Sequence, residues 1–196
     1  MNYMAKLHFF YSTMNAGKST SLLQSNHNYI ESNLKTLLFL PKQIAETSNN
    51  KIISRIGLEE EAVVFDNNFN LFEHIKNNGS DYLDCIFVDE AQFLDRYQVR
   101  QLSMVVDTFN IPVMCYGIRT DFQGELFEGS KELLAISDNL IELKTVCFQC
   151  NKKATMVIRL DHNGKVATKG KKVLIGGNEI YKSICRKHFR ELTKLL

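Results

Sequence analysis

The amino-acid sequence predicts an α/β fold, with a mainly parallel sheet flanked by helices and a small C-terminal unit of different composition. In residues 1–146, short apolar runs alternate with helix-like stretches, which is typical of a parallel sheet. Polar and charged motifs follow several of these runs, at the carboxyl ends of strands where ligands bind in such sheets. Both the charge balance and the spacing of the cysteines change at Cys147.

Apolar runs define the expected strands, and the stretches between them define the expected helices. The strands are predicted at Leu7–Tyr11, Thr36–Leu40, Cys85–Val88, Ile111–Ile118 and Asn139–Val146. The helices are predicted at about Gly17–Glu31, Leu71–Asn77, Asp95–Phe109 and Ser130–Ile136.

The C-terminal unit is expected to contain strand-like segments at Thr155–Asp161 and Lys172–Ile175, joined by a lysine-rich connection. A helix at about Tyr181–Leu195 is expected to close the chain. This unit is too small for a large core, so a metal ion would help to stabilise it. We therefore predict two domains, residues 1–146 and residues 147–196.

The net charge of +2 conceals a division between these two parts. Residues 1–146 contain 12 basic and 19 acidic side chains, whereas residues 147–196 contain 12 basic and 3 acidic ones. A basic C-terminal unit could contact nucleic acid, a phosphorylated ligand or an acidic neighbouring subunit. A solvated lysine-rich surface explains the same charge equally well.

The cysteines and the apolar runs bear on the cellular compartment. Five cysteines is an odd number, and three of them have metal-ligand spacing, which favours a reducing environment over a disulfide-stabilised secreted fold. The longest apolar runs are too short to cross a bilayer, and Lys6 and His8 interrupt the apolar start that a signal peptide needs. We expect a cytoplasmic protein without a membrane partner.

A phosphate-binding loop is predicted at the turn from the first strand to the first helix. The segment Ser12-Thr13-Met14-Asn15-Ala16-Gly17-Lys18-Ser19 has the P-loop pattern, except that Ser12 stands where the first glycine is expected. Backbone N–H groups of this turn can surround a polyphosphate, while Lys18 neutralises its charge and the Ser19 hydroxyl binds Mg²⁺. An ordinary strand-to-helix turn with a surface lysine is the alternative.

A pair of carboxylates follows the strand Cys85–Val88, which we expect to lie beside the first strand. Asp89 would organise the Mg²⁺ shell, as the corresponding aspartate does in P-loop enzymes. Because successive strand residues point to opposite faces, Glu90 could face a substrate and accept its hydroxyl proton. Many strands end in acidic residues for solubility alone, so the pair is informative mainly together with Lys18.

Two ligand pairs predict a zinc site in the C-terminal unit. The segments Cys147-Phe148-Gln149-Cys150 and Cys185-Arg186-Lys187-His188 supply three thiols and one imidazole, a closed tetrahedral set for Zn²⁺. A closed set leaves no position for a substrate, so this zinc would be structural. Cys85 and Cys115 lie within apolar strands and are expected to be inert core residues.

Together these motifs resemble the thymidine kinases of the zinc-containing P-loop type (type II), and bacterial members are the most similar. The resemblance covers nearly the whole chain. It depends on Ser12–Ser19, Asp89–Phe93, Tyr116–Phe122, the two ligand pairs, and Ile175–Gly177 followed by Tyr181. It implies a RecA-like P-loop fold that uses ATP and Mg²⁺ to phosphorylate the 5′-hydroxyl of thymidine, giving dTMP and ADP.

The resemblance also implies roles for individual residues. Glu90 matches the catalytic base, and Lys18 and its loop bind ATP together with Asp89, Glu90, Ala91 and Gln92. Residues matching the nucleoside pocket are Met14, Phe93, Ile118, Phe122, Phe127 and Tyr181. Residues matching a lasso segment that covers the substrate are Val173, Leu174, Ile175, Gly176 and Gly177. The phenylalanines would otherwise be interpreted as core residues, and Tyr181 as packing on the zinc site.

The family further implies a homotetramer, with the end product dTTP as a feedback inhibitor. One position departs from its pattern, because Glu46 stands where an arginine that meets the transferred phosphate is expected. Arg55 lies nearby but matches a different position of the family pattern. Either another cation substitutes for the expected arginine, or phosphoryl transfer is weaker.

Two other functions remain open at this point. The basic C-terminal unit suggests a zinc-containing NTPase that binds nucleic acid. However, it lacks interleaved aromatic residues, and the acidic part of the chain would repel a polyanion. We therefore expect no nucleic-acid partner. The departure at Glu46 is the only support for an inactive regulatory protein.

Overall fold

The central element is a six-stranded sheet in which every neighbouring pair of strands is parallel. The computed structural model describes residues 4–174 and 180–195. The strand order is β5-β2-β6-β7-β1-β8. Their bounds are β1 Leu7–Ser12, β2 Thr36–Pro41, β5 Val63–Phe65, β6 Cys85–Val88, β7 Val113–Ile118 and β8 Asn139–Glu142. The α/β class with a mainly parallel sheet is thus confirmed.

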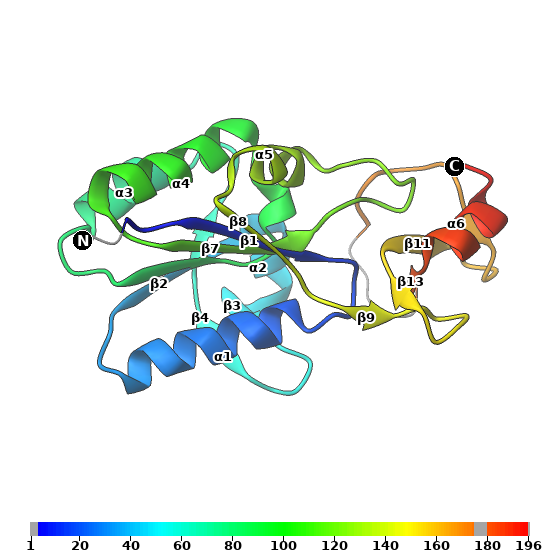
Figure 1. The fold of residues 1–196 in the computed structure, drawn as a ribbon, viewed down its shortest axis with the longest axis horizontal. Coiled ribbons are helices and arrows are strands. Elements are labelled where there is room, and N and C mark those ends of the chain that lie inside the picture. The colour runs from blue at the N-terminus through cyan, green and yellow to red at the C-terminus, as the bar shows by residue number, and fades with distance from the viewer. Residues whose placement is uncertain (1–3, 175–179, 196) are drawn as a thin grey trace.

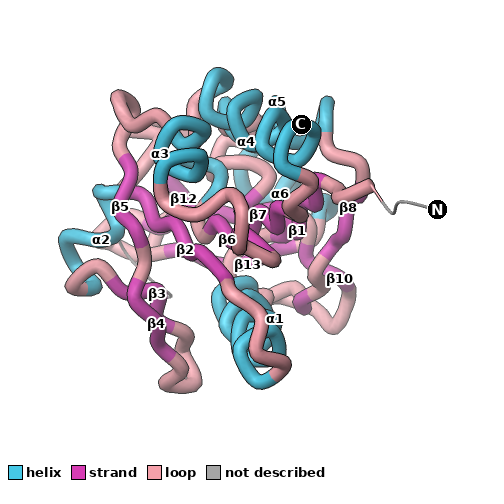
Figure 2. Tube along the Cα trace, turned by 90° about the vertical axis from the view of Figure 1, so that its left-hand side faces the viewer, coloured by secondary structure: helices cyan, strands magenta, loops and turns pink. Residues whose placement is uncertain are grey.

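Helices cover both faces of this sheet. Figures 1 and 2 show α3, α4 and α5 on one face and α1 on the other. Their bounds are α1 Lys18–Glu31, α3 Leu71–Asn77, α4 Arg96–Phe109 and α5 Glu128–Ile136. The capping of α4 explains where it begins: the Asp95 side chain accepts from the Gln98 N–H (2.8 Å), and Gln98 Oε1 accepts from the Asp95 N–H (3.2 Å).

Alternate strand residues enter two different cores. On the face of α3 and α4, Phe39 and Ile86 pack with Val99 and other buried residues. On the face of α1, Leu38 and Phe87 pack in a second cluster with further apolar side chains. A strand that is buried on both faces reads as a continuous apolar run rather than as an alternating one, which is why the sequence identified these strands.

The order of the strands corrects one prediction. Cys85–Val88 was expected beside the first strand, but β7 lies between β1 and β6 and pairs with both. The carboxyl ends of the three strands nevertheless lie at one edge of the sheet, since all pairs are parallel. The phosphate loop and the carboxylate pair therefore still meet there.

Several short elements were not predicted. They are α2 (Lys42–Ser48), the antiparallel pair β3 (Lys51–Ile53) and β4 (Glu59–Glu61), strand β5, and the 3₁₀ turn η1 (Ala91–Phe93). Figure 2 shows β3 and β4 projecting on the α1 side of the sheet. None of the helices in the described part of the chain has the length and apolar character that a membrane crossing requires.

The C-terminal unit contains small sheets and one helix beyond the carboxyl ends of the main strands (Figure 1). Its elements are β10 Lys153–Ala154, β11 Met156–Leu160, β12 Val166–Ala167, β13 Tyr181–Ile184 and α6 Arg186–Thr193. Strand β9 (Thr145–Val146), which lies just before residue 147, pairs with β10. A separate apolar cluster holds it together, in which Met156, Ile184 and Phe189 are buried.

Three predictions in this region were wrong. The expected helix Tyr181–Leu195 begins only at Arg186, because residues 181–184 form β13 and pair with β11. Residues 172–174 are not a strand, and β12 takes the place beside β11 instead. The expected strand Asn139–Val146 divides into β8 in the main sheet and β9, which pairs with β10.

Candidate active site

The phosphate loop is a turn that contains left-handed backbone. Asn15 has a φ of 62° and Gly17, which precedes α1, has a φ of 71°. Glycine adopts this conformation without a steric penalty, so Gly17 lets the chain enter the helix with its first N–H groups exposed to the loop. Such a helix start attracts anions through its free N–H groups and its dipole.

Lys18 lies within this loop and is almost completely buried. Its Nζ donates to the Thr13 carbonyl (2.8 Å) and to Ser12 Oγ (3.3 Å). Burial lowers the pKa of Lys18, the carboxylates of Glu90 and Asp89 oppose that shift, and the charge of Arg55 adds to it. Ser12 fits the position of the missing glycine, since it ends strand β1 and does not have the positive φ that would favour glycine. Its hydroxyl donates to the Thr13 carbonyl (2.6 Å).

Ser19 and Asp89 form the pair that could hold a metal ion. Ser19 Oγ donates to Asp89 Oδ2 (2.8 Å), although the two residues come from different segments of the chain. Burial, together with the charge of Glu90, raises the pKa of Asp89 to about 7. Hydrogen bonds from Ser19 and from the Glu90 N–H partly oppose this shift. A hydroxyl beside a carboxylate is a donor set that suits Mg²⁺.

Glu90 is held in an unusual backbone conformation. Strand β6 ends at Val88, and Glu90 has a φ of 49°. The predicted strand alternation therefore does not extend to Glu90, and the left-handed turn sets its direction instead. Gln92 fixes the carboxylate, because its side-chain amide donates to Glu90 Oε2 while Gln92 Oε1 accepts from the Ile118 N–H (3.0 Å).

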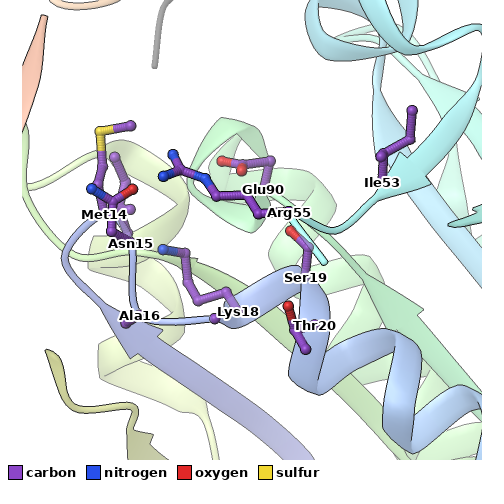
Figure 3. Close-up of a pocket in the computed structure, with 11 residues that line it drawn as sticks. Met14, Asn15, Ala16, Lys18, Ser19, Thr20, Ile53, Arg55 and Glu90 are labelled. Carbon is purple, nitrogen blue, oxygen red and sulfur yellow. The ribbon is translucent and has the colours of Figure 1, made fainter. Parts of the chain in front are cut away.

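Two cavities meet at this carboxylate. The first has a volume of about 300 Å³ and is lined by the phosphate loop, Arg55 and Glu90. The second has a volume of about 140 Å³ and is mainly apolar. Met14, Glu90 and Ile118 line both cavities. Figure 3 shows Glu90 and Lys18 pointing toward the first cavity from opposite sides.

The second cavity brings together the predicted pocket residues that the structure describes. Its walls include Met14, Phe93, Ile118, Phe122, Phe127, Val173, Leu174 and Tyr181. The rings of Phe93 and Phe127 pack edge to face, with centroids 6.0 Å apart. Flat apolar walls with a few polar groups are suited to an aromatic ligand.

The segment predicted to cover the substrate is only partly described. The Tyr181 hydroxyl donates to the Leu174 carbonyl (3.1 Å) and accepts from the Leu174 N–H (3.3 Å). Ile175, Gly176 and Gly177 lie outside the described residues. Ala91, predicted among the ATP-binding residues, is fully buried in the core and lines neither cavity.

Several residues at the two cavities were not predicted. Arg55 follows β3, and its guanidinium extends toward Glu90 and the phosphate loop (Figure 3). Gln43, Asp121 and Lys172 add polar groups to the second cavity. Local sequence gives no signal for them, because no motif spacing connects them to the phosphate loop.

The four predicted zinc ligands form a single cluster. The ligand atoms of Cys147, Cys150, Cys185 and His188 all lie within 4.8 Å of one another. The separations include 3.3 Å between Cys185 Sγ and His188 Nδ1 and 4.0 Å between Cys150 Sγ and Cys185 Sγ. Zn–S bonds of about 2.3 Å in a tetrahedron place ligand atoms about 3.8 Å apart, so the donor set fits zinc.

The thiol of Cys147 ionises more readily than an ordinary cysteine, whereas the pKa of Cys150 is raised. Burial opposes the ionisation of Cys147, but hydrogen bonds from the Cys185 backbone and from His188 outweigh that effect and lower its pKa to about 6. For Cys150, a hydrogen bond from the Lys152 backbone lowers the pKa, but burial and contacts with the Cys147 and Cys185 thiols outweigh it. Thiolates are the form that binds metal. By contrast, Cys85 and Cys115 are fully buried in strands, and burial raises the pKa of each, for Cys85 to about 12.

A carboxylate between a polyphosphate cavity and an acceptor pocket defines the class of this protein, a P-loop kinase for a small molecule. The comparison with known families agrees, since the family model described as "Thymidine kinase" matches residues 5–189. The chain belongs to the thymidine kinase family, a family of ATP-dependent nucleoside kinases.

Curated relatives match over nearly their whole length. The thymidine kinase of Shewanella oneidensis is 55% identical over 96% of this chain and 98% of its own. That of Mannheimia succiniciproducens is 54% identical over 97% of both chains. The thymidine kinase of Escherichia coli O157:H7 is 52% identical over 96% of this chain and 92% of its own.

Proposed function

We propose that this chain transfers the γ-phosphoryl group of ATP to the 5′-hydroxyl of thymidine, giving dTMP and ADP. The observation that supports this most directly is the position of Glu90, which lines both the phosphate cavity and the apolar cavity. A nucleoside in the second cavity would present its hydroxyl to the same carboxylate that faces the terminal phosphate. Transfer between aligned groups depends mainly on positioning and charge stabilisation.

In the proposed mechanism, residues of the phosphate loop hold the triphosphate. N–H groups at the start of α1 and the Lys18 ammonium would bind the β- and γ-phosphates, with Ser12–Ser19 as the ATP-binding segment. Ser19 and Asp89 would hold Mg²⁺, which neutralises charge on the phosphate oxygens. Lys18 would exchange its contact with the Thr13 carbonyl (2.8 Å) for a phosphate oxygen.

Glu90 would act as the general base. Gln92 orients its carboxylate through a direct hydrogen bond, and the Ile118 N–H anchors Gln92 in turn. The carboxylate would accept the proton of the 5′-hydroxyl as the oxygen bonds to phosphorus. A positioned base typically contributes about 10²–10⁴ in rate.

The thymine base would lie among the aromatic walls of the second cavity. Phe93, Phe122 and Phe127 supply apolar surface, and Met14 and Ile118 lie where this cavity joins the first. Val173 and Leu174 would cover the ligand, with Tyr181 holding Leu174 by two hydrogen bonds. A cover that excludes water would suppress phosphoryl transfer to water.

Other parts of the proposal concern the whole protein. The Cys₃His cluster would hold a structural zinc, and residues 1–146 and 147–196 would form two domains, an arrangement supported by the separate C-terminal core. A homotetramer in the cytoplasm, inhibited by dTTP in the substrate site and without a nucleic-acid partner, completes the proposal.

Comparing the four deoxynucleosides as phosphate acceptors tests the function. We expect ATP turnover with thymidine and much less with deoxyadenosine, deoxyguanosine or deoxycytidine. ATP turnover that responds to single-stranded DNA and not to any nucleoside would indicate a nucleic-acid-dependent NTPase. Absence of turnover under all conditions would indicate an inactive member of the family.

The variant Glu90→Gln tests the mechanism. Glutamine keeps the shape of the side chain and one acceptor oxygen for the Gln92 amide, but it cannot accept the proton. We expect ATP and thymidine to bind nearly as before while kcat falls about 10²–10⁴-fold. Near-normal turnover would remove Glu90 from the mechanism.

A further inference from the structure

Strand β13 connects three parts of the molecule that are far apart in sequence. Side chains at alternate positions of a strand point to the same face, so Tyr181 and Ser183 share one face of β13. Tyr181 hydrogen-bonds Leu174 at the second cavity, whereas Ser183 reaches the phosphate loop. Cys185, the next residue after the strand, belongs to the zinc-ligand cluster.

The link to the phosphate loop is a chain of two hydrogen bonds. Thr13 Oγ1 donates to Ser183 Oγ (2.6 Å), and Ser183 Oγ donates to the Met14 carbonyl (2.5 Å). Both side chains are buried, with Thr13 5% and Ser183 6% exposed. Consecutive hydrogen bonds away from water polarise and strengthen one another, so this contact constrains the loop more than a surface pair would.

We propose that Ser183 is a positioning residue that fixes the ATP phosphate loop from the C-terminal unit. This inference rests on the proposed ATP-dependent function and adds a role for a residue that touches neither substrate. Met14 lines both cavities. Fixing the loop at the Met14 carbonyl therefore keeps the phosphate cavity and the nucleoside cavity at a constant position relative to each other. The zinc cluster fixes the end of β13, which gives a structural metal an influence on nucleotide binding.

The geometry favours this role over plain packing of a small residue in a strand. A packing role needs only the volume of the side chain, whereas Ser183 uses its hydroxyl both as acceptor and as donor. Without Ser183, the Met14 carbonyl loses the shorter of its two hydrogen bonds and keeps only the longer one from Thr13 Oγ1 (3.2 Å). The loop would then sample conformations in which its N–H groups do not converge on phosphate.

Equilibrium binding of ATP, measured without an acceptor, tests the proposal in the full-length zinc-loaded chain. We expect Ser183→Ala to weaken ATP binding about 3- to 30-fold, as expected for the loss of two buried hydrogen bonds. Lys182→Ala is the matched control in the same strand, since Lys182 lies on the opposite face with its Nζ over the Phe148 ring (5.1 Å). We expect this control to bind ATP like the unmodified chain.

A second pair of variants separates the hydroxyl from packing effects. Ser183→Thr and Ser183→Val have the same shape and differ only in the hydroxyl, so any strain from the added methyl groups is common to both. We expect the Val variant to bind ATP about 3- to 30-fold more weakly than the Thr variant. Zinc content should match within the pair, which a general loss of structure would not allow, whereas the unfolding midpoint of the Val variant should be lower because two buried hydrogen bonds are lost.

The outcomes distinguish this inference from the proposed function. Equal ATP affinity in the Thr and Val variants, with Ser183→Ala equal to Lys182→Ala, overturns the role of Ser183 and leaves the kinase intact. An unmodified chain that binds ATP but phosphorylates another acceptor changes the proposed substrate and leaves this inference standing. An unmodified chain that does not bind ATP overturns both.

Discussion

At the scale of single residues, the unusual feature is the source of the cation beside the phosphate cavity. Position 46, where an arginine was expected, is an exposed glutamate on α2. Arg55, which follows β3, lines the phosphate cavity and lies close enough to Lys18 to lower its pKa. Two cations at one cavity repel each other until an anion binds, which favours a polyphosphate ligand.

The variant Arg55→Ala tests whether Arg55 takes the place of the arginine that was expected at position 46. Hydrogen bonds to charged groups contribute about 1.5–3 kcal/mol, so we expect kcat/KM for ATP to fall about 10- to 100-fold. Lys51→Ala is the control, because Lys51 lies on the same hairpin but pairs with Glu59 (2.6 Å) and does not line the cavity.

Adding Glu46→Arg to Arg55→Ala should restore part of the lost activity if position 46 can supply the cation. Kinetics of the single and double variants measure this rescue. Equal kinetics for Arg55→Ala and Lys51→Ala would contradict the role of Arg55 at the phosphate.

The raised pKa of Asp89 predicts that the stability of the chain depends on pH. Its pKa rises from 3.8 unfolded to about 7 folded, mainly through burial, so the folded chain binds the additional proton between these values. The stability of the metal-free chain should therefore fall as pH rises from about 4 to 7. The isosteric variant Asp89→Asn removes this dependence and should be more stable than the unmodified chain at pH 8, by about 1–3 kcal/mol.

Denaturant unfolding without Mg²⁺ or ATP at pH 5 and pH 8 measures this effect. The difference between the two proteins should be small at pH 5 and larger at pH 8. A difference that does not change with pH would show that Asp89 is charged in the folded chain throughout this range.

The sequence predicted those residues that lie in contiguous motifs. Lys18 and Ser19 begin the helix that follows the loop after β1, Asp89 and Glu90 directly follow β6, and a parallel sheet brings such strand ends together. Arg55 could not be found in this way, because its hairpin consists of two three-residue strands, one of them entirely glutamate. Nothing in that pattern indicates burial or direction.

At the scale of elements, close packing between β7 and η1 determines how Glu90 is held. A Cβ atom at Gly117 would lie 2.9 Å from Gln92 Oε1 and 3.0 Å from the Gln92 backbone nitrogen. Such separations are too short, so glycine at this position lets Gln92 approach the strand. Gln92 then bonds both the Ile118 N–H and the Glu90 carboxylate.

The variant Gly117→Ala should therefore displace Gln92 and leave Glu90 misdirected. We expect kcat to fall about tenfold or more with little change in ATP affinity, and stability to fall by about 1–3 kcal/mol from overpacking. Steady-state kinetics and denaturant unfolding measure the two effects. In a Gln92→Ala background, the further loss of kcat caused by Gly117→Ala should be smaller, because both changes act on Glu90 through the Gln92 side chain. Independent, additive losses would contradict this explanation.

The C-terminal elements show where prediction from local sequence failed. Residues 181–184 were expected to begin a helix, yet they pair with β11, for example Met156 with Ile184. Pairing between residues so far apart in sequence leaves little local trace, and a four-residue strand next to a helix reads as part of that helix. The strands of the main sheet were easier to predict from the sequence, because burial on both faces makes them continuously apolar.

At the scale of the whole molecule, the main sheet and the C-terminal unit have separate apolar clusters and meet at the active site. The main sheet has an apolar cluster on each face, and the C-terminal unit has its own cluster built around Met156, Ile184 and Phe189. Two of the zinc ligands, Cys147 and Cys185, are themselves part of that third cluster. So small a core stabilises little by itself, so a zinc ion bound by the Cys₃His cluster would take a direct part in folding this unit.

Metal analysis of the purified chain should therefore find about one zinc ion per chain. Cys150→Ala removes the partly exposed ligand and should abolish tight zinc binding and lower the unfolding midpoint. Cys85→Ala is the control, since Cys85 is buried in β6 outside the cluster, and it should keep the zinc even if it loses some stability to the cavity that it leaves.

Because Ser183 lies two residues before Cys185, loss of zinc should also weaken ATP binding, which Cys85→Ala should not do. Zinc-free chain that binds ATP with undiminished affinity would show that the C-terminal unit holds the phosphate loop without its metal.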